Sequence, residues 1–362
     1  MPGDPGGARK VVFTRTSSTR RRCRIVTTDG LTPRSAPGSY PSSRPAAYRG
    51  GVRSRLAPSP TGALHVGNVR TFLLTWLHVR AAGGTLVLRV DDLDGPRVKR
   101  GAERDALDDL RWLGLDWDEA EGVLVQSQRG AVYEAVADDL VARGLAYPCV
   151  CTRSEVETAA SAPHGPDGPR YPGTCRGRFS SLADAVARTG RPAALRFVAA
   201  PGPAAFDDLL FGPQAFDPHA ETGDFVVFKS NGTAAYQLAT VVDDDASAVD
   251  LVVRGADLLP STSRQLLLHR ALGLRPPRHL HLPLVVGPDG RRLAKRHGDT
   301  SVRALRAAGW TAPGLVGRVA ETAGLAAPGE RVSPRDLLAR YDPARLTREP
   351  VVLDATAFAV AR

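Results

Sequence analysis

The sequence predicts an α/β protein in which a parallel, nucleotide-binding sheet is interrupted by a metal-binding insertion and followed by a short helical region. Three observations lead to this prediction. Strand and helix patterns alternate from residue 52 to residue 143. Three of the four cysteines then fall within 27 residues, at Cys149, Cys151 and Cys175. A Gly/His-rich loop at 61–68 precedes this cluster, and a basic loop at 291–298 follows it. An alternation of strands and helices is typical of a parallel sheet with helical crossovers.

The first half of the sheet is predicted from residues 51–146. Val52–Leu56 is expected to be a short strand that enters a turn at Pro58–Gly62. Leu64–Arg80 has apolar residues at helical spacing, and Thr85–Val90 is a strongly apolar strand. Further helices are expected at 101–113 and 130–143.

The second half is predicted to follow an insertion. Residues 147–205 form this insertion, and its loop-rich part at 147–178 contains Gly and Pro throughout. In the second half, 206–305, we expect one helix at Ser263–Leu272 and four strands, at Asp224–Phe228, Gln237–Val242, Asp250–Arg254 and Leu280–Val286. The remaining residues, 306–362, are expected to be helical, because a capping hydroxyl at Ser333 precedes a proline and an acidic residue.

Composition limits the possible partners. The net charge is +10, but residues 1–50 contribute +8 of it, so a nucleic-acid surface on the remainder must be local. This basic leader is rich in Gly, Pro, Ser and Arg and is predicted to be disordered and dispensable; a transit peptide and a wrongly assigned start codon are the alternatives. Few, clustered cysteines favour a reducing, cytoplasmic location, and no apolar run is long enough for a membrane span. The chain is expected to be a monomer.

The Gly/His loop, Thr-Gly-Ala-Leu-His-Val-Gly-Asn at 61–68, has the features of a phosphate-binding turn. Gly62 and Gly67 let the backbone approach a ligand closely, and His65 opens the following helix, where free N–H groups favour an anion. An isolated motif of this kind is more often a structural turn. Its significance therefore depends on the rest of the chain.

Five segments in order resemble the class I glutamyl-tRNA synthetases. The leading Arg-Leu-Ala-Pro-Ser-Pro-Thr-Gly-Ala-Leu-His-Val-Gly-Asn at 55–68 is similar to their first signature motif, and Arg-Leu-Ala-Lys-Arg-His-Gly at 292–298 to their second. The other three matching segments are 89–97, 235–239 and 253–258. The resemblance covers residues 53–300 and implies the Rossmann-type sheet of that class, split by an insertion.

The resemblance also implies the roles of individual residues. His65 and Lys295 would be catalytic and, with Gly67 and Asn68, would bind ATP, whose Mg²⁺ enters with the nucleotide. The glutamate-binding residues would be Arg55, Leu56, Ala57, Pro58, Ser59, Asp91, Tyr236 and Arg254. Three positions depart from the family pattern: Asp91 stands where Glu is usual, Arg292 replaces a lysine, and Ala294 replaces a serine. We expect the first to affect affinity and none of them to change the reaction type.

The cysteine cluster favours one structural Zn²⁺, because thiolates are soft ligands and three of them suit zinc. From the residues alone, His164 is the conventional fourth ligand. Cys-X-Cys at 149–151 followed by Tyr171 and Cys175 resembles the truncated paralogues of the same enzymes, the glutamyl-queuosine tRNA(Asp) synthetases, which implies Tyr171 instead. A cluster of three buried, metal-free thiols is the remaining alternative.

The function implied is ATP-dependent activation of L-glutamate and its transfer to the queuosine base in the anticodon of tRNA(Asp). The chain stops about 60 residues after the basic loop, where a full glutamyl enzyme has an anticodon-binding domain. Two alternatives remain: a minimal glutamyl-tRNA synthetase that charges tRNA(Glu), and a catalytically silent RNA-binding paralogue.

Overall fold

A computed structural model describes residues 51–95, 98–159, 169–290, 300–353 and 358. The leader at 1–50, His164 and Lys295 lie outside these residues, so the predictions made for them keep that status. None of the helices among the described residues has the length and apolar character needed to cross a membrane.

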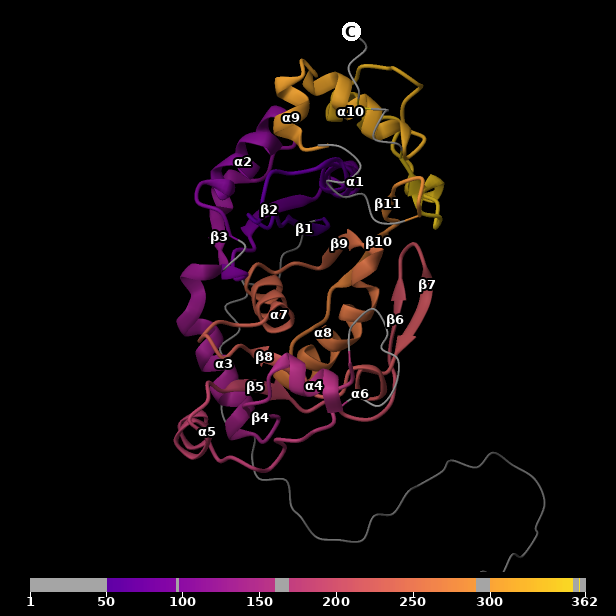
Figure 1. Ribbon diagram of the computed structural model, residues 1–362. Coiled ribbons are helices and arrows are strands. Elements are labelled where there is room, and N and C mark those ends of the chain that lie inside the picture. The colour runs from indigo at the N-terminus through magenta and orange to yellow at the C-terminus, as the bar shows by residue number, and fades with distance from the viewer. Residues whose placement is uncertain (1–50, 96–97, 160–168, 291–299, 354–357, 359–362) are drawn as a thin grey trace, which may run out of the picture. The chain divides into compact units, whose positions relative to one another are not determined.

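Two sheets build the half of the molecule that holds the nucleotide motifs (Figure 1). One contains the parallel strands β1 (Arg53–Leu56), β2 (Thr85–Val90) and β3 (Val123–Val125) in the order β1-β2-β3. The other has the order β7-β6-β10-β9: β9 (Leu251–Gly255), β10 (Arg278–Leu282) and β6 (Ala204–Asp208) are parallel, and β7 (Gly212–Phe216) is antiparallel to β6. The Asp250 amide donates to the Arg53 carbonyl over 3.0 Å, which joins the two sheets at β1 and β9.

Helix α1 (Val66–Ala81) is the centre of the main hydrophobic core. Ten of its 16 residues are buried, because β1 and β2 pack on one side and α10 (Ala312–Glu321) and α11 (Pro334–Leu338) on another. Burying leucine-sized side chains stabilises a fold by about 1.5–3 kcal/mol each. The other described helices outside the insertion are α2 (Ala102–Trp112), α3 (Gly130–Ala142), α7 (Tyr236–Ala246), α8 (Leu259–Leu272) and α9 (Val302–Ala307).

The insertion has its own antiparallel sheet at the opposite end of the molecule (Figure 1). Its strands are β4 (Ala146–Cys149), β5 (Ala194–Phe197) and β8 (Phe225–Phe228), in the order β4-β5-β8. The short helices α4 (Arg153–Ala159), α5 (Leu182–Thr189) and α6 (Pro218–Glu221) accompany them. A two-stranded pair of β11 (Val285–Val286) and β12 (Val351–Val352) completes the described elements, with 3₁₀ turns at 119–121, 126–129, 256–258 and 343–345.

Two predictions about these elements were wrong. Gln237–Val242 is not a strand but part of α7, whose residues 238–245 are all buried; a helix buried on every side loses the 3.6-residue pattern that would distinguish it from a strand. The strand predicted at Asp224–Phe228 exists as β8, but it belongs to the insertion's sheet and does not resume the parallel one. The predicted strand Leu280–Val286 is divided into β10 and β11 around Pro283.

Candidate active site and cysteine cluster

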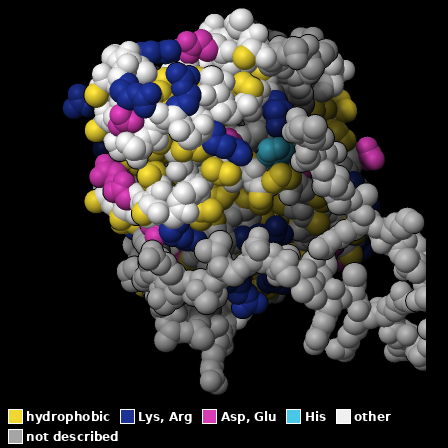
Figure 2. Space-filling view, turned by 90° about the horizontal axis from the view of Figure 1, so that it is seen from below, with side chains coloured by type: hydrophobic (Ala, Val, Ile, Leu, Met, Phe, Trp, Pro, Cys, Tyr) yellow, Lys and Arg dark blue, Asp and Glu magenta, His cyan; other side chains and the backbone are white. Residues whose placement is uncertain are grey.

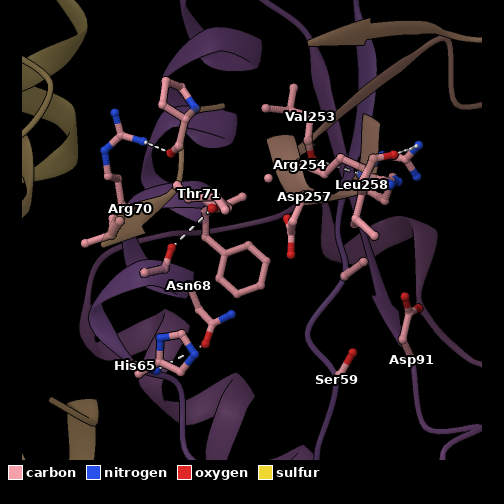
Figure 3. A pocket seen from close by; sticks show the side chains of 18 of the residues that line it. Ser59, His65, Asn68, Arg70, Thr71, Asp91, Val253, Arg254, Asp257 and Leu258 are labelled. Atoms are coloured by element: carbon pink, nitrogen blue, oxygen red, sulfur yellow. Dashed lines mark hydrogen bonds between the residues drawn. The ribbon is translucent and has the colours of Figure 1, made fainter. Parts of the chain in front are cut away.

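A cavity of about 250 Å³ opens at the carboxyl ends of β1, β2 and β9, beside the first turn of α1 (Figure 3). The chain runs from β1 to β2 on one side and returns as β9 on the other. In open α/β sheets such a reversal of strand order leaves a crevice at the carboxyl ends of the strands, where ligands bind. Nine of the predicted site residues line this cavity: Arg55, Ala57, Ser59, His65, Gly67, Asn68, Asp91, Tyr236 and Arg254.

The Gly/His loop forms a second side of the cavity. His65 is the N-cap of α1, and its amide donates to Asn68 Oδ1 over 3.2 Å. A Cβ on Gly67 would lie 3.3 Å from the His65 ring, so glycine leaves the imidazole its space. Gly67 and Asn68 also line the cavity. The free N–H groups of this first turn make it suitable for an anion.

Residues 300–302, directly after the basic loop, are fixed to this same turn. The Val66 amide donates to the Thr300 carbonyl over 3.2 Å, and the Val302 amide to the Leu64 carbonyl over 2.7 Å. Thr300 follows Lys295 by five residues, a length of chain that can span at most about 18 Å. Residues 300–302 are therefore held beside His65 by two backbone hydrogen bonds.

Four alternating charges, here called the ion chain, form one wall. Arg55 Nε lies 3.1 Å from Asp244 Oδ1, Arg89 Nη1 lies 2.6 Å from the same oxygen, and Arg89 Nε lies 2.6 Å from Asp91 Oδ1. Burial opposes ionisation of Asp244, but Arg55 and Arg89 outweigh it and hold its pKa below the ordinary value. At Asp91 burial prevails and raises the pKa.

Arg254 lies on the neighbouring strand β9, in a different environment. It is 5% exposed and donates to His281 Nε2 (3.1 Å), Gln265 Oε1 (2.9 Å), Thr262 Oγ1 (2.7 Å) and, over longer distances, Tyr236 Oη (3.3 Å) and the Leu258 carbonyl (3.4 Å). All these acceptors are neutral, and burial lowers the pKa of the guanidinium. The β9 strand presents this side chain, and α8 supplies two of the acceptors.

Two of the predicted glutamate residues have no side chain on the cavity. Leu56 is fully buried in the main core, and Pro58 contributes its carbonyl, which accepts a hydrogen bond from the Asp91 amide over 3.0 Å. Neither is among the lining residues. Both therefore position their neighbours Arg55, Ala57 and Ser59.

Sequence reasoning missed five charged or polar residues around the cavity. Arg89 and Asp244 complete the ion chain, His281 supports Arg254, and Arg70 and Asp257 line the wall. Arg70 is buried, donates to the Pro283 carbonyl and Thr322 Oγ1, and has a pKa lowered by burial to about 10. The three consecutive aspartates at 243–245, all buried, were a signal that could have identified Asp244.

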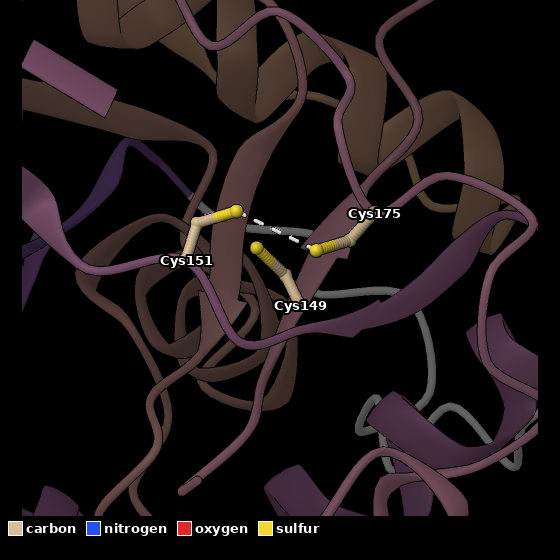
Figure 4. Close-up of side chains that lie close together, drawn as sticks. All are labelled: Cys149, Cys151 and Cys175. Carbon is tan, nitrogen blue, oxygen red and sulfur yellow. Dashed lines mark hydrogen bonds between the residues drawn. The ribbon is translucent and has the colours of Figure 1, made fainter. Parts of the chain in front are cut away.

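The three clustered cysteines converge in the insertion (Figure 4). Their sulfur atoms lie within 4.8 Å of one another, and those of Cys151 and Cys175 are 3.5 Å apart. The hydroxyl oxygen of Tyr171 lies 3.3 Å from the Cys149 sulfur and 3.8 Å from that of Cys151. Three thiols and one phenol oxygen thus meet around a single point, and this donor set fits a tetrahedral metal site.

Arg196 supports this cluster from the neighbouring strand β5. Its Nε donates to the Cys149 sulfur over 3.2 Å, and its guanidinium carbon lies 3.7 Å from the centre of the Tyr171 ring. These two contacts hold the Cys149 and Tyr171 side chains in place. Second-layer contacts of this kind are typical of metal sites.

Comparison with known proteins identifies the class of enzyme to which these sites belong. Residues 51–319 match the family model for the catalytic domain of class I tRNA synthetases (E and Q). A glutamyl-Q tRNA(Asp) synthetase of Symbiobacterium thermophilum is 48% identical over 84% of this chain and 97% of its own length. A glutamate–tRNA ligase of Syntrophus aciditrophicus is 42% identical over 71% of this chain and 54% of its own length. A crystal structure of a glutamate tRNA ligase from Elizabethkingia meningosepticum, in complex with its amino acid, is similar with a TM-score of 0.70 and 25% identity over 85% of this chain and 68% of that one.

Proposed function

The chain belongs to the class I tRNA synthetases for Glu and Gln and, within them, to the glutamyl-Q tRNA(Asp) synthetases, and from this premise we propose how its residues perform the reaction. It is an aminoacyl-tRNA ligase, and it activates L-glutamate with ATP. In that step a glutamate carboxylate oxygen attacks the α-phosphorus, the bond to the β-phosphate oxygen breaks, and glutamyl-adenylate and pyrophosphate form. The proposed acceptor is the queuosine base in the anticodon of tRNA(Asp): one of its hydroxyl groups would form an ester with the glutamyl carbonyl carbon, while the bond from that carbon to the phosphate breaks and AMP is released.

The observation that supports glutamate as substrate is the charge of the cavity. The ion chain contributes two guanidinium groups and two carboxylates, so its charges cancel. Arg70 and Asp257, which also line the cavity, carry opposite charges. Arg254 adds one positive charge, and no carboxylate among the described residues forms an ion pair with it. A fork of N–H donors suits a carboxylate, and glutamate has a net charge of −1 at pH 7. Arg254 would bind the side-chain carboxylate, while Asp91, held by Arg89, would face the ammonium group.

ATP would lie against the first turn of α1. We propose that His65 and the backbone N–H groups near Gly67 and Asn68 bind the phosphates from one side, and that Lys295 binds them from the other. Negative charge increases on the α-phosphate in the transition state, so donors fixed in advance stabilise that state more than the ground state. Mg²⁺ bound to ATP would screen the phosphate charge and retain several waters.

Zinc is the metal we propose for the cysteine cluster, with Cys149, Cys151, Cys175 and Tyr171 as ligands. The position of the Tyr171 oxygen among the three sulfurs favours it as the fourth ligand. The cluster lies in the insertion, away from the cavity at the ends of β1 and β2 (Figure 1), so its role would be structural. Such a site would stabilise a loop-rich segment that has only a small core of its own.

The described part of the face in Figure 2 has mixed charges, so it does not indicate by itself where RNA would bind. In the described part of the face shown in Figure 2, Lys and Arg side chains are interspersed with acidic and apolar ones. Several arginines of the insertion are already paired, including Arg176 with Asp224, Arg188 with Asp184 and Arg191 with Glu155. Electrostatic attraction of RNA would then come from local groups of basic side chains, because the net charge of residues 51–362 is small. Because its substrate is tRNA, the enzyme is proposed to be cytoplasmic. It is also proposed to be a monomer.

The experiment that tests the acceptor locates the attached glutamate. Radiolabelled glutamate, ATP and the full chain are incubated with tRNA(Asp) that contains queuosine, with a tRNA(Asp) transcript that lacks it, and with tRNA(Glu). Cleavage of the product between the anticodon and the 3′ end should leave the label in the anticodon fragment of the first RNA alone. Label at the 3′ end of tRNA(Glu) would instead identify a minimal glutamyl-tRNA synthetase.

A further inference from the structure

Arg254 is surrounded by acceptors that fix its orientation without neutralising it. All three of its guanidinium nitrogens donate to side chains, and the nearest acceptors are the imidazole of His281, the amide oxygen of Gln265 and the hydroxyl of Thr262. None of these groups is an anion. Within the described residues no carboxylate forms an ion pair with Arg254, although the side chain is 5% exposed. Burying a cation without a counter-ion costs free energy, which an arriving anion recovers.

Two carboxylates lie close to Arg254 without contacting it: Asp244, whose charge acts on Arg254 from the ion chain, and Asp208, which is separated from Arg254 by the His281 ring. Asp208 Oδ2 lies 2.7 Å from His281 Nδ1 and accepts the His281 backbone N–H over 3.0 Å. Because arginine only donates, His281 Nε2 must accept from Arg254 and be unprotonated, so Nδ1 carries the proton and donates to Asp208. His281 is fully buried, and desolvation keeps its pKa below the ordinary value. The imidazole therefore separates the Asp208 charge from the Arg254 charge.

We propose that His281 and Gln265 are positioning residues that keep Arg254 charged, oriented and unpaired, and that this arrangement makes the cavity select a carboxylate over an amide of the same shape. The inference rests on the proposed binding of the glutamate side chain by Arg254. Glutamate can accept two hydrogen bonds from the guanidinium and neutralise it. Glutamine can accept through one atom only, and its NH₂ group would face the N–H donors of Arg254.

The most direct test is Gln265→Glu, which has the same shape and places a carboxylate on Arg254. Glutamate-dependent exchange between ATP and pyrophosphate is measured with the full chain. The KM for glutamate should rise at least about 30-fold and the preference for glutamate over glutamine should fall at least about 10-fold, while the KM for ATP stays constant. Gln265→Met, which removes the acceptor without adding charge, should change the KM for glutamate only about threefold. Equal effects of the two variants, or an unchanged KM in Gln265→Glu, would overturn the inference.

A second pair of variants separates the two sides of the imidazole. Gln at position 281 can place an oxygen near the position of Nε2 and accept from Arg254, whereas Asn can place an N–H near Nδ1 and donate to Asp208. We expect His281→Gln to keep the KM for glutamate within about threefold and His281→Asn to raise it at least about tenfold. The reverse order would show that the contact with Asp208 alone matters. If the unmodified chain shows no glutamate-dependent exchange, the proposed function is wrong. That result can be distinguished from both possible orders of the two variants, because each order requires an active unmodified chain.

Discussion

The neighbouring strands that line the cavity use buried arginine in opposite ways. Arg55 and Arg89 lie in the ion chain, where Asp244 and Asp91 neutralise them. Arg254, equally buried, has neutral partners only. The difference indicates that the ion chain is a scaffold whose charges are already satisfied, whereas Arg254 is prepared for an anionic ligand. Similar burial of the same residue type thus leads to two different functions.

The largest effect on activity is expected from Arg254→Leu. Removing the unpaired cation should lower kcat/KM for glutamate at least about 1000-fold, because the substrate carboxylate would be buried without a partner. The melting temperature should stay constant or rise, since an uncompensated buried charge is removed. Pyrophosphate exchange and thermal unfolding of the same sample measure both quantities. A large fall in melting temperature would show instead that Arg254, like the ion chain, stabilises the fold.

The opposite pattern is expected for Asp244→Asn in the ion chain. Loss of the shared carboxylate leaves Arg55 and Arg89 with an uncompensated charge, and the free energy of unfolding should fall by about 3–5 kcal/mol. Asp105→Asn breaks a partly exposed pair with Arg303 and serves as the control, with an expected change of about 1 kcal/mol or less. Denaturant unfolding compares the two variants. Similar stability of both would contradict a scaffold role for the ion chain.

The cysteine cluster extends the comparison to buried negative charge. When a metal is bound, the three thiolates would have both the ion and Arg196 as counter-charges. We expect about one zinc per chain by elemental analysis, and a lower melting temperature after treatment with a strong chelator. Cys175→Ser should lose the metal, whereas Cys23→Ser should retain it. Full metal content in Cys175→Ser would show that the cysteine cluster is not the site that binds the metal.

The smallest effect is expected from lowering the pH from 6.5 to 5. Burial first, and then the charge of Arg254, lower the pKa of His279 from 6.5 to about 2. The folded state therefore leaves His279 neutral below pH 6.5 while the unfolded chain binds a proton, so stability is lost progressively as the pH falls from 6.5 towards 2. The expected slope is about 1.4 kcal/mol per pH unit for this residue. His279→Phe should reduce the slope measured by denaturant unfolding between pH 6.5 and 5; an unchanged slope would show that His279 does not cause it.

Local patterns predicted much of this molecule. The strands at 53–56 and 85–90, helix α1 and the cysteine cluster follow from short stretches of sequence, and the capping box at Ser333 marks α11 correctly. What the sequence did not reveal depends on distant pairing. Arg89 and Asp244 are 155 residues apart, and the strand at 225–228 could not be assigned to a sheet from its own residues. Likewise, the neutral surroundings of Arg254 come from α8 and β10, which only the fold brings together.

Exchange of radiolabelled pyrophosphate into ATP tests the central claim most directly. The full chain is assayed with glutamate and without any tRNA, beside the Lys295→Ala variant. We predict exchange that depends on glutamate, and at least about hundredfold less of it in the variant at an unchanged melting temperature. A well-folded, zinc-loaded chain that shows no exchange would contradict glutamate activation and favour a catalytically silent RNA-binding protein.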